Sequence, residues 1–180
     1  MSSRPLFNLI VTHEPGYENY VMARAQIRDI LGSEMRVVDT AQSIMLLRVD
    51  DPFEAVRRIS EELPESTPVL RVIPVDEVVE PTVQKVADAV GRLASKIPEG
   101  ETFKIRIDGH LYDDKGGVWE RVSRREAIEV IAERVDRPVN LSEPQWLVYV
   151  KVVRLWRGDE FAAVVVAKPN DIFSTHGRGG

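Results

Sequence analysis

The strongest constraint on this sequence is that its hydrophobic residues change period several times along the chain. Apolar or alternating runs that are typical of strands occur at residues 6–11, 35–39, 43–50 and 70–79. Between them, apolar residues on one helical face predict helices over residues 17–31 and from Pro52 to about residue 63. Pro74 lies inside the last run and predicts an edge strand or a bulge. In chain order these elements are β-α-β-β-α-β, the ferredoxin-like arrangement.

A second set of elements begins near residue 81. Apolar spacing predicts helices over residues 83–97 and 123–135, and strict alternation predicts a strand over residues 103–108. A loop is predicted over residues 109–122. Two long apolar strands, residues 146–155 and 160–167, are expected at the centre of a sheet covered by helices. The sequence therefore predicts an α+β protein with domains at residues 1–80 and 81–176 and a flexible tail at 177–180.

Composition excludes several kinds of site. The chain contains no Cys, which excludes disulfides, thiol nucleophiles and cysteine-bound metals. Its three His residues are too scattered in the sequence to form a metal motif, and no cofactor is expected. No apolar run is long enough for a membrane helix, and the first residues lack the pattern of a signal peptide. We therefore expect a cytoplasmic protein without a membrane partner.

Positive charge gathers locally in a chain that is acidic overall. The sequence has 24 Lys and Arg against 29 Asp and Glu, for a net charge of -5. Ser123 and Glu126 form a capping box, which predicts a helix start that places Arg124 and Arg125 at the first two helical positions. Free backbone N–H groups and two guanidinium groups would converge there on an anion. The alternative is that these arginines pair with neighbouring glutamates.

Further basic residues lie close by in the sequence and predict one continuous surface for a phosphate backbone. Trp119, in the predicted loop, is expected to be available for stacking on an unpaired base. The alternative is a set of scattered charges that only keep the protein soluble. The predicted RNA-binding residues are Lys104, Arg106, His110, Lys115, Arg121, Arg124, Arg125, Lys151 and Lys168.

No catalytic constellation is predicted from the residues. The acidic pair at residues 113–114 is expected to form a turn, and Ser174-Thr175-His176 lacks an orienting carboxylate. Lys115-Gly116-Gly117 lacks the spacing of a phosphate-binding loop. We therefore expect a protein that is not an enzyme.

The order of motifs in the second predicted domain resembles the THUMP domain, an RNA-binding module of tRNA modification systems. The resemblance rests on residues 99–106, on Ser123-Arg124-Arg125-Glu126 and on residues 138–144, where Asn140 stands in place of the family's usual Asp. THUMP domains commonly follow a ferredoxin-like domain, as predicted here. The resemblance implies that the second domain binds the acceptor end of tRNA and that the first helps to set the distance to the modified base.

Stand-alone proteins of this layout are similar to the non-catalytic tRNA-binding adaptor of the tRNA N4-acetylcytidine system. In that system a separate tRNA acetyltransferase supplies the chemistry, so the resemblance implies tRNA and such an enzyme as partners. Two other functions stay open. One is a regulatory module that binds a small anion, and the other is an RNA-modifying enzyme that uses Asp113, Asp114 or His176.

Overall fold

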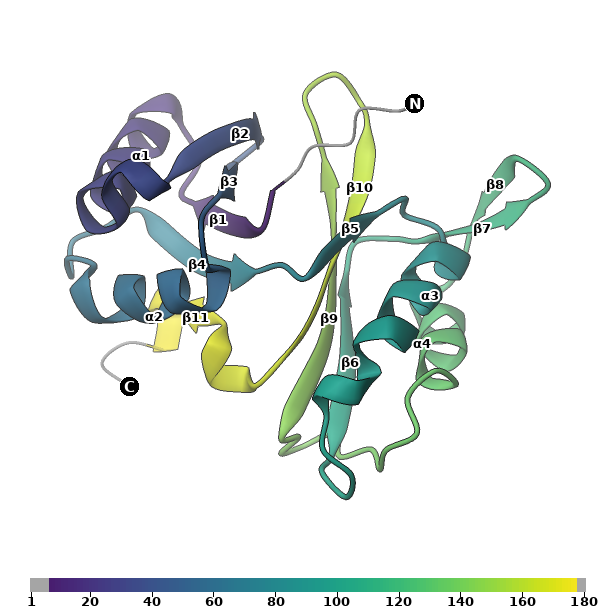
Figure 1. The fold of residues 1–180 in the computed structure, drawn as a ribbon. Helices are drawn as coiled ribbons and strands as arrows, with labels where there is room; N and C mark the ends of the chain where they lie inside the picture. Colours follow the sequence, from purple (N-terminus) through teal and green to yellow (C-terminus); the bar gives the residue numbers. More distant parts are fainter. Residues whose placement is uncertain (1–6, 178–180) are drawn as a thin grey trace. The chain divides into compact units, whose positions relative to one another are not determined.

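The computed structural model describes residues 7–177 and divides the chain into two compact units (Figure 1). Among the described residues, the first unit contains 7–75, Leu155–Arg157 and 170–177, whereas the second contains Asp76–Arg154 and Gly158–Pro169. The structure thus differs from the expected continuous domain at residues 81–176, because the C-terminal segment returns to the first unit. Residues 178–180 of the predicted tail lie outside the described residues.

The first unit is built on an antiparallel sheet with the strand order β11-β4-β1-β3-β2. Helices α1 (Tyr17–Leu31) and α2 (Pro52–Glu62) share one hydrophobic core with this sheet (Figure 1). Without β11, the strand order is that of the ferredoxin-like fold, as the sequence predicts. The strands are β1 (Leu9–His13), β2 (Arg36–Ala41), β3 (Ile44–Arg48), β4 (Val69–Pro74) and β11 (Phe173–Ser174).

The predicted strand over residues 70–79 is wrong, because two strands in two different sheets occupy it. β4 ends at Pro74, and β5 (Glu77–Val79) begins the second unit's sheet. β4 is also no edge strand, since Phe173 and Ser174 of β11 pair with Val72 and Arg71. The proline stands where pairing stops, which its missing N–H group explains.

Side chains cap the helices at their predicted starts. The Asp51 carboxylate accepts hydrogen bonds from the backbone N–H groups of Phe53 and Glu54, with Pro52 in the first turn of α2. Thr82 caps α3 (Val83–Leu93) in the same way, and Ser123 caps α4 (Arg124–Ala132). These caps satisfy backbone donors that no helical carbonyl can reach.

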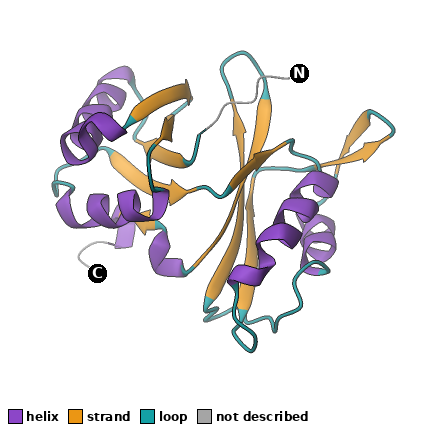
Figure 2. Cartoon of the chain, viewed as in Figure 1, coloured by secondary structure: helices purple, strands orange, loops and turns teal. Residues whose placement is uncertain are grey.

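The second unit has a sheet with the order β5-β10-β9-β6, in which β6 (Phe103–Asp108) runs parallel to β9 (Trp146–Arg154). β10 (Glu160–Ala167) and β9 are central, as the sequence predicts. Helices α3 and α4 pack against one face of this sheet (Figure 2). Alternate residues of β6, among them Phe103 and Ile105, enter this core, so Lys104 and Arg106 lie on the opposite face.

The loop predicted over residues 109–122 is wrong in its central part, which forms a β-hairpin. Strands β7 (Tyr112–Lys115) and β8 (Val118–Arg121) are joined by Gly116 and Gly117 alone (Figure 2). Both glycines have a positive φ, 65° and 96°, as a two-residue turn that matches the twist of its strands requires. Gly-Gly between two short strands is a recognisable hairpin signal that the prediction did not use.

Gly109 directly follows β6 and begins the connection to the hairpin, and its backbone tolerates no side chain. Its φ is 104°, and a Cβ atom added there would lie 2.8 Å from the Cβ atom of Val152 in the neighbouring strand. Glycine is therefore required on two counts, backbone conformation and space.

We expect Gly109→Ala to lower the free energy of unfolding by about 2–4 kcal/mol, from positive-φ strain together with overpacking against Val152. Gly100→Ala is the matched control, because Gly100 has a φ of 87° but no atom within 4 Å of the added Cβ. The control should lose only about 1–2 kcal/mol. Urea unfolding measures both losses, and equal losses would contradict the packing argument.

Candidate nucleic-acid interface

The start of α4 holds two arginines where the capping box predicts them. The Ser123 hydroxyl accepts a hydrogen bond from the Glu126 N–H group at 3.1 Å, so Arg124 and Arg125 occupy the first helical turn. The Nη2 atom of Arg124 donates to the carbonyl oxygen of Gly109 at 3.4 Å. This contact joins the start of α4 to the end of β6.

Arg106 is held in place by two neighbours on the same face of the sheet. Its Nε atom donates to Asp108 at 3.2 Å, and its guanidinium carbon lies 5.4 Å from the centre of the Tyr149 ring. The buried Tyr149 hydroxyl also donates a hydrogen bond to Asp108. Asp108 therefore connects the exposed arginine to the buried tyrosine and fixes the direction of the arginine side chain.

The carboxyl group of Asp108 is more acidic than usual. Burial by itself raises its pKa, but the hydrogen bond from Tyr149 and the positive charges of Arg106 and Lys151 outweigh burial and hold the pKa below its ordinary value. Lys151 stands opposite Asp108 in the register of β6 and β9, which explains its influence. Asp108 is therefore a carboxylate at neutral pH.

We name the cationic residues around the end of β6 and the start of α4 the basic end of the second unit. Two of its members are paired with acids: Arg106 with Asp108, and Arg125 with Glu129 at 3.4 Å. Arg124 donates a hydrogen bond to a carbonyl group. Within residues 7–177, His110 and Arg121 take part in no ion pair or side-chain hydrogen bond. The members are Arg106, His110, Arg121, Arg124 and Arg125.

Lys115 lies on the hairpin, where its Nζ atom is 2.8 Å from a carboxylate oxygen of Glu120. The hydrogen bond from Lys115 to Glu120 raises the pKa of the lysine. Both side chains are exposed, and exposed pairs of this kind contribute little to stability. Trp119 is half-exposed on the same hairpin, and its ring centre lies 5.7 Å from that of Tyr112.

The structure separates the remaining predicted lysines. Lys104 precedes Arg106 by two residues on the same face of β6, and Lys151 lies beside Asp108, so both extend the basic end along the sheet. Lys168 does not join them. Its Nζ atom lies 5.5 Å from the ring centre of Trp146, which packs into the core on the helix-covered face.

Two of the residues considered for catalysis, Asp113 and Asp114, have structural partners instead. Asp113 accepts a hydrogen bond from Gln84 at 2.6 Å, and Asp114 accepts one from the N–H group of Gly117 at 2.8 Å, as turn-forming residues do. Thr175 donates to the carbonyl oxygen of Val69. Among residues 7–177, no group of three or more His, Asp or Glu side chains could hold a metal ion.

The part of the chain that the structure describes also contains no helix long and apolar enough to cross a membrane.

Asp108 and Tyr149 were not predicted from the sequence as residues that position Arg106. The alternation of β6 already placed Asp108 on the face of Arg106, but the contribution of Tyr149 depends on the parallel register of two strands distant in the sequence.

Tyr149→Phe should remove the hydrogen bond to Asp108 and destabilise the protein by about 1 kcal/mol at neutral pH. Because the folded-state pKa of Asp108 is lowered, the stabilisation exists above the unfolded-state pKa and is lost as pH falls through the folded-state pKa. The difference in unfolding free energy between wild type and variant should therefore shrink below about pH 4. Urea unfolding at neutral and acidic pH checks this, with Tyr17→Phe as an exposed control. A difference that does not change with pH would contradict it.

Solved structures share the fold of most of this chain. PH1313 from Pyrococcus horikoshii Ot3 is 14% identical with a TM-score of 0.59, over 91% of this chain and 55% of that chain. TrmN from Thermus thermophilus is 15% identical with a TM-score of 0.51, over 90% of this chain and 46% of that chain. A predicted N6-adenine-specific DNA methylase from Listeria monocytogenes str. 4b F2365 is 14% identical with a TM-score of 0.50, over 88% and 40%.

This chain therefore spans about half the length of the solved chains it matches. No protein-family model and no curated protein matches its sequence. The expectation that the protein is not an enzyme is contradicted, because the structures that share its fold include TrmN and a protein named as a methylase, which point to enzymes. What the likeness establishes is the fold alone, that of an α+β protein.

Proposed function

We propose that the second unit binds tRNA and that this chain is the RNA-binding part of a tRNA-modifying enzyme. The observation that carries the proposal is the contact between Arg124 and the Gly109 carbonyl group, which brings the cationic start of α4 to the end of β6. The fold that this chain shares with TrmN and with a protein named as a predicted N6-adenine-specific DNA methylase supports a role in a modifying enzyme. The proposal assigns RNA binding to the basic end and assigns no residue to the chemical step.

The electrostatics of α4 favour an anion at its start. The positive end of the helix dipole lies there, and a cation placed beside it costs about 0.3–1 kcal/mol when exposed. A phosphate group that accepts hydrogen bonds from Arg124 and Arg125 would reverse the sign of that interaction. The side chain of Arg125 is 90% exposed, so it reaches a ligand without rearrangement of the core.

The spread of the cations favours a polynucleotide over one small anion. Lys104 and Arg106 follow one strand, Lys151 lies on its neighbour, and Arg121 and Arg124 flank the start of α4. Several separated cations suit successive phosphates of a backbone, because each contact releases counterions and adds to the affinity. The exposed acid partner of Arg125 opposes binding only weakly, since such exposed pairs contribute about 0–1 kcal/mol.

The narrower form of the proposal follows the resemblance to the THUMP domain. In that form the second unit binds the acceptor end of tRNA, the modified nucleoside is N4-acetylcytidine, and a separate tRNA acetyltransferase is the partner. The methylase among the structural neighbours instead favours methyl transfer as the reaction. Both forms place the same residues on the RNA. They differ in the nucleoside that is modified and in whether a separate protein supplies the chemical step.

Arg124→Glu/Arg125→Glu should weaken binding to intact tRNA at least about tenfold and reduce the slope of log affinity against log salt by about 2, because two phosphate contacts are lost. A salt series of fluorescence titrations measures both quantities. Arg28→Glu/Arg36→Glu is the matched control, since it makes the same change in net charge at exposed arginines of the first unit. Binding that the first pair leaves unchanged would contradict the proposed interface.

Mass spectrometry of tRNA nucleosides from cells that lack this protein should show the loss of one modified nucleoside. Loss of N4-acetylcytidine would support the narrower form, and loss of a methylated nucleoside would support methyl transfer. A wild-type set of nucleosides would contradict a role in tRNA modification.

A second titration, with tRNA that lacks its 3′ end, should show weaker binding than intact tRNA if the acceptor end is the part that the protein binds.

A further inference from the structure

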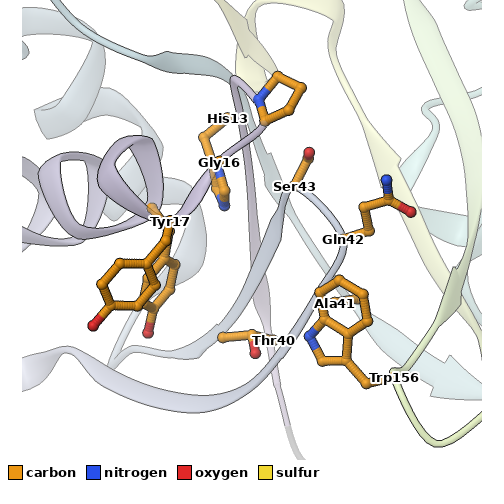
Figure 3. Close-up of a pocket in the computed structure, with 10 residues that line it drawn as sticks. His13, Gly16, Tyr17, Thr40, Ala41, Gln42, Ser43 and Trp156 are labelled. Atoms are coloured by element: carbon orange, nitrogen blue, oxygen red, sulfur yellow. The ribbon is translucent and has the colours of Figure 1, made fainter.

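The first unit contains a cavity of about 450 Å³ that the RNA-binding surface described above does not include (Figure 3). The end of β1, the start of α1 and the turn between β2 and β3 form its walls, together with Trp156 from the segment Leu155–Arg157 of the same unit. Its volume lies in the usual range for a small-ligand site. The lining residues are His13, Pro15, Gly16, Tyr17, Tyr20, Thr40, Ala41, Gln42, Ser43 and Trp156.

Aromatic rings dominate this cavity. The ring centres of His13 and Tyr20 are 5.9 Å apart, and those of Tyr17 and Tyr20 are 6.1 Å apart. Tyr17 and Trp156 are 78% and 69% exposed, respectively, so two large rings face solvent at the cavity. Exposed rings at a concave site are suited to stacking on a flat, unsaturated ligand.

His13 supplies a buried polar atom with no partner. Only 4% of the residue is exposed, and its Nδ1 atom lies 2.8 Å from the carbonyl oxygen of Glu14. Because a carbonyl oxygen only accepts, Nδ1 carries the hydrogen of this bond. Nε2 has no hydrogen-bond partner among the described residues, which is unusual for a buried polar atom. In Figure 3 the His13 ring lies between Tyr17 and Ser43.

The turn opposite His13 is held in a strained conformation. Ser43 has a φ of 60°, and it is the one residue other than glycine with a positive φ in residues 7–177. Its carbonyl oxygen accepts a hydrogen bond from the backbone N–H group of His13 at 3.0 Å, which fixes the turn against β1. Strain of this kind is concentrated at functional sites. The turn brings the side chains of Gln42 and Ser43 to the cavity, where an amide and a hydroxyl group can both donate and accept.

The chemistry of the lining selects a neutral ligand. No Lys, Arg, Asp or Glu is among the lining residues, so nothing there compensates the charge of a phosphate group. A planar ring with donors and acceptors on its edge matches both the aromatic side chains and the polar groups of the turn. A nucleobase has this combination of properties.

We propose that this cavity binds an unpaired nucleobase of the RNA whose backbone contacts the second unit. This inference rests on the proposed function, because the base belongs to the RNA that the second unit is proposed to bind. That the ligand is a base follows from the chemistry of the cavity. The base stacks on Tyr17 and Trp156, and its edge is bound by the polar groups of Gln42 and Ser43.

The test measures binding of intact tRNA and, separately, of the four free ribonucleosides. Tyr17→Ala and Trp156→Ala are the test variants, because both side chains are exposed and their loss should leave the fold intact. Each should weaken tRNA binding about 5- to 100-fold, the range of one stacked base, with the salt slope unchanged because no phosphate contact is removed. Met22→Ala, an exposed residue of α1 outside the cavity, is the matched control and should bind as wild type does.

The outcomes separate this inference from the proposed function. Wild-type tRNA binding in both test variants would overturn the binding of an RNA base in this cavity and leave the proposed function standing. If the wild-type protein binds no tRNA, the proposed function fails. In that case nucleoside binding that Tyr17→Ala abolishes would still support a base site, and no nucleoside binding would overturn it. Nucleoside binding that Tyr17→Ala abolishes while tRNA binding stays unchanged would identify a free nucleoside and overturn the RNA as source.

Discussion

Parallel pairing of β6 with β9 is the constraint on which the second unit depends. Neighbouring parallel strands cannot be joined by a tight turn, so residues 109–145 must carry the chain from one end of the sheet to the other. That connection contains the β7–β8 hairpin and α4, and with them most of the basic end. The sheet can therefore be packed as an apolar core while the connection carries the charged groups. Connections that leave the carboxyl ends of parallel strands are the usual place for ligands in open α/β sheets.

Acidic residues in the same region set how the cations are presented. Asp108 holds Arg106 over the Tyr149 ring, and Glu129 pairs with Arg125 one helical turn along. Both pairs restrict the arginine side chains, and the exposed Arg125–Glu129 pair is broken at little cost. Arg124 bonds only a carbonyl group and keeps its full charge available. A protein with a net charge of -5 can in this way present a local cationic surface, because the sign of a field near a surface depends on the closest charges.

Local sequence signals predicted the elements that local interactions determine. The helix Tyr17–Leu31 and the strand Phe103–Asp108 have their predicted bounds, and Ser123 caps α4 as the capping box requires. The failures have nonlocal causes, apart from the overlooked Gly-Gly turn. Residues 70–79 were predicted as one strand because they are mostly apolar. In the structure β4 pairs with β11 and β5 pairs with β10, and each of these partners lies more than 80 residues further along the chain. The return of the C-terminal segment to the first sheet likewise has no signal within that segment, and neither does the register that brings Tyr149 to Asp108.

The same distinction explains why the aromatic cavity was not predicted. In the sequence, His13-Glu14 has the character of a helix entry, and nothing there indicates that a turn some thirty residues later faces it. The chain order β1-α1-β2-β3 places β3 directly beside β1, so the β2–β3 turn and the start of α1 meet at one end of the first sheet. Topology thus gives the first unit a neutral, aromatic site and gives the second unit a cationic one. In nucleic-acid recognition these chemistries have separate roles, since phosphate contacts position the ligand and base contacts specify it. Under the two proposals made above, the neutral site selects among RNAs that the charges of the second unit alone would bind equally.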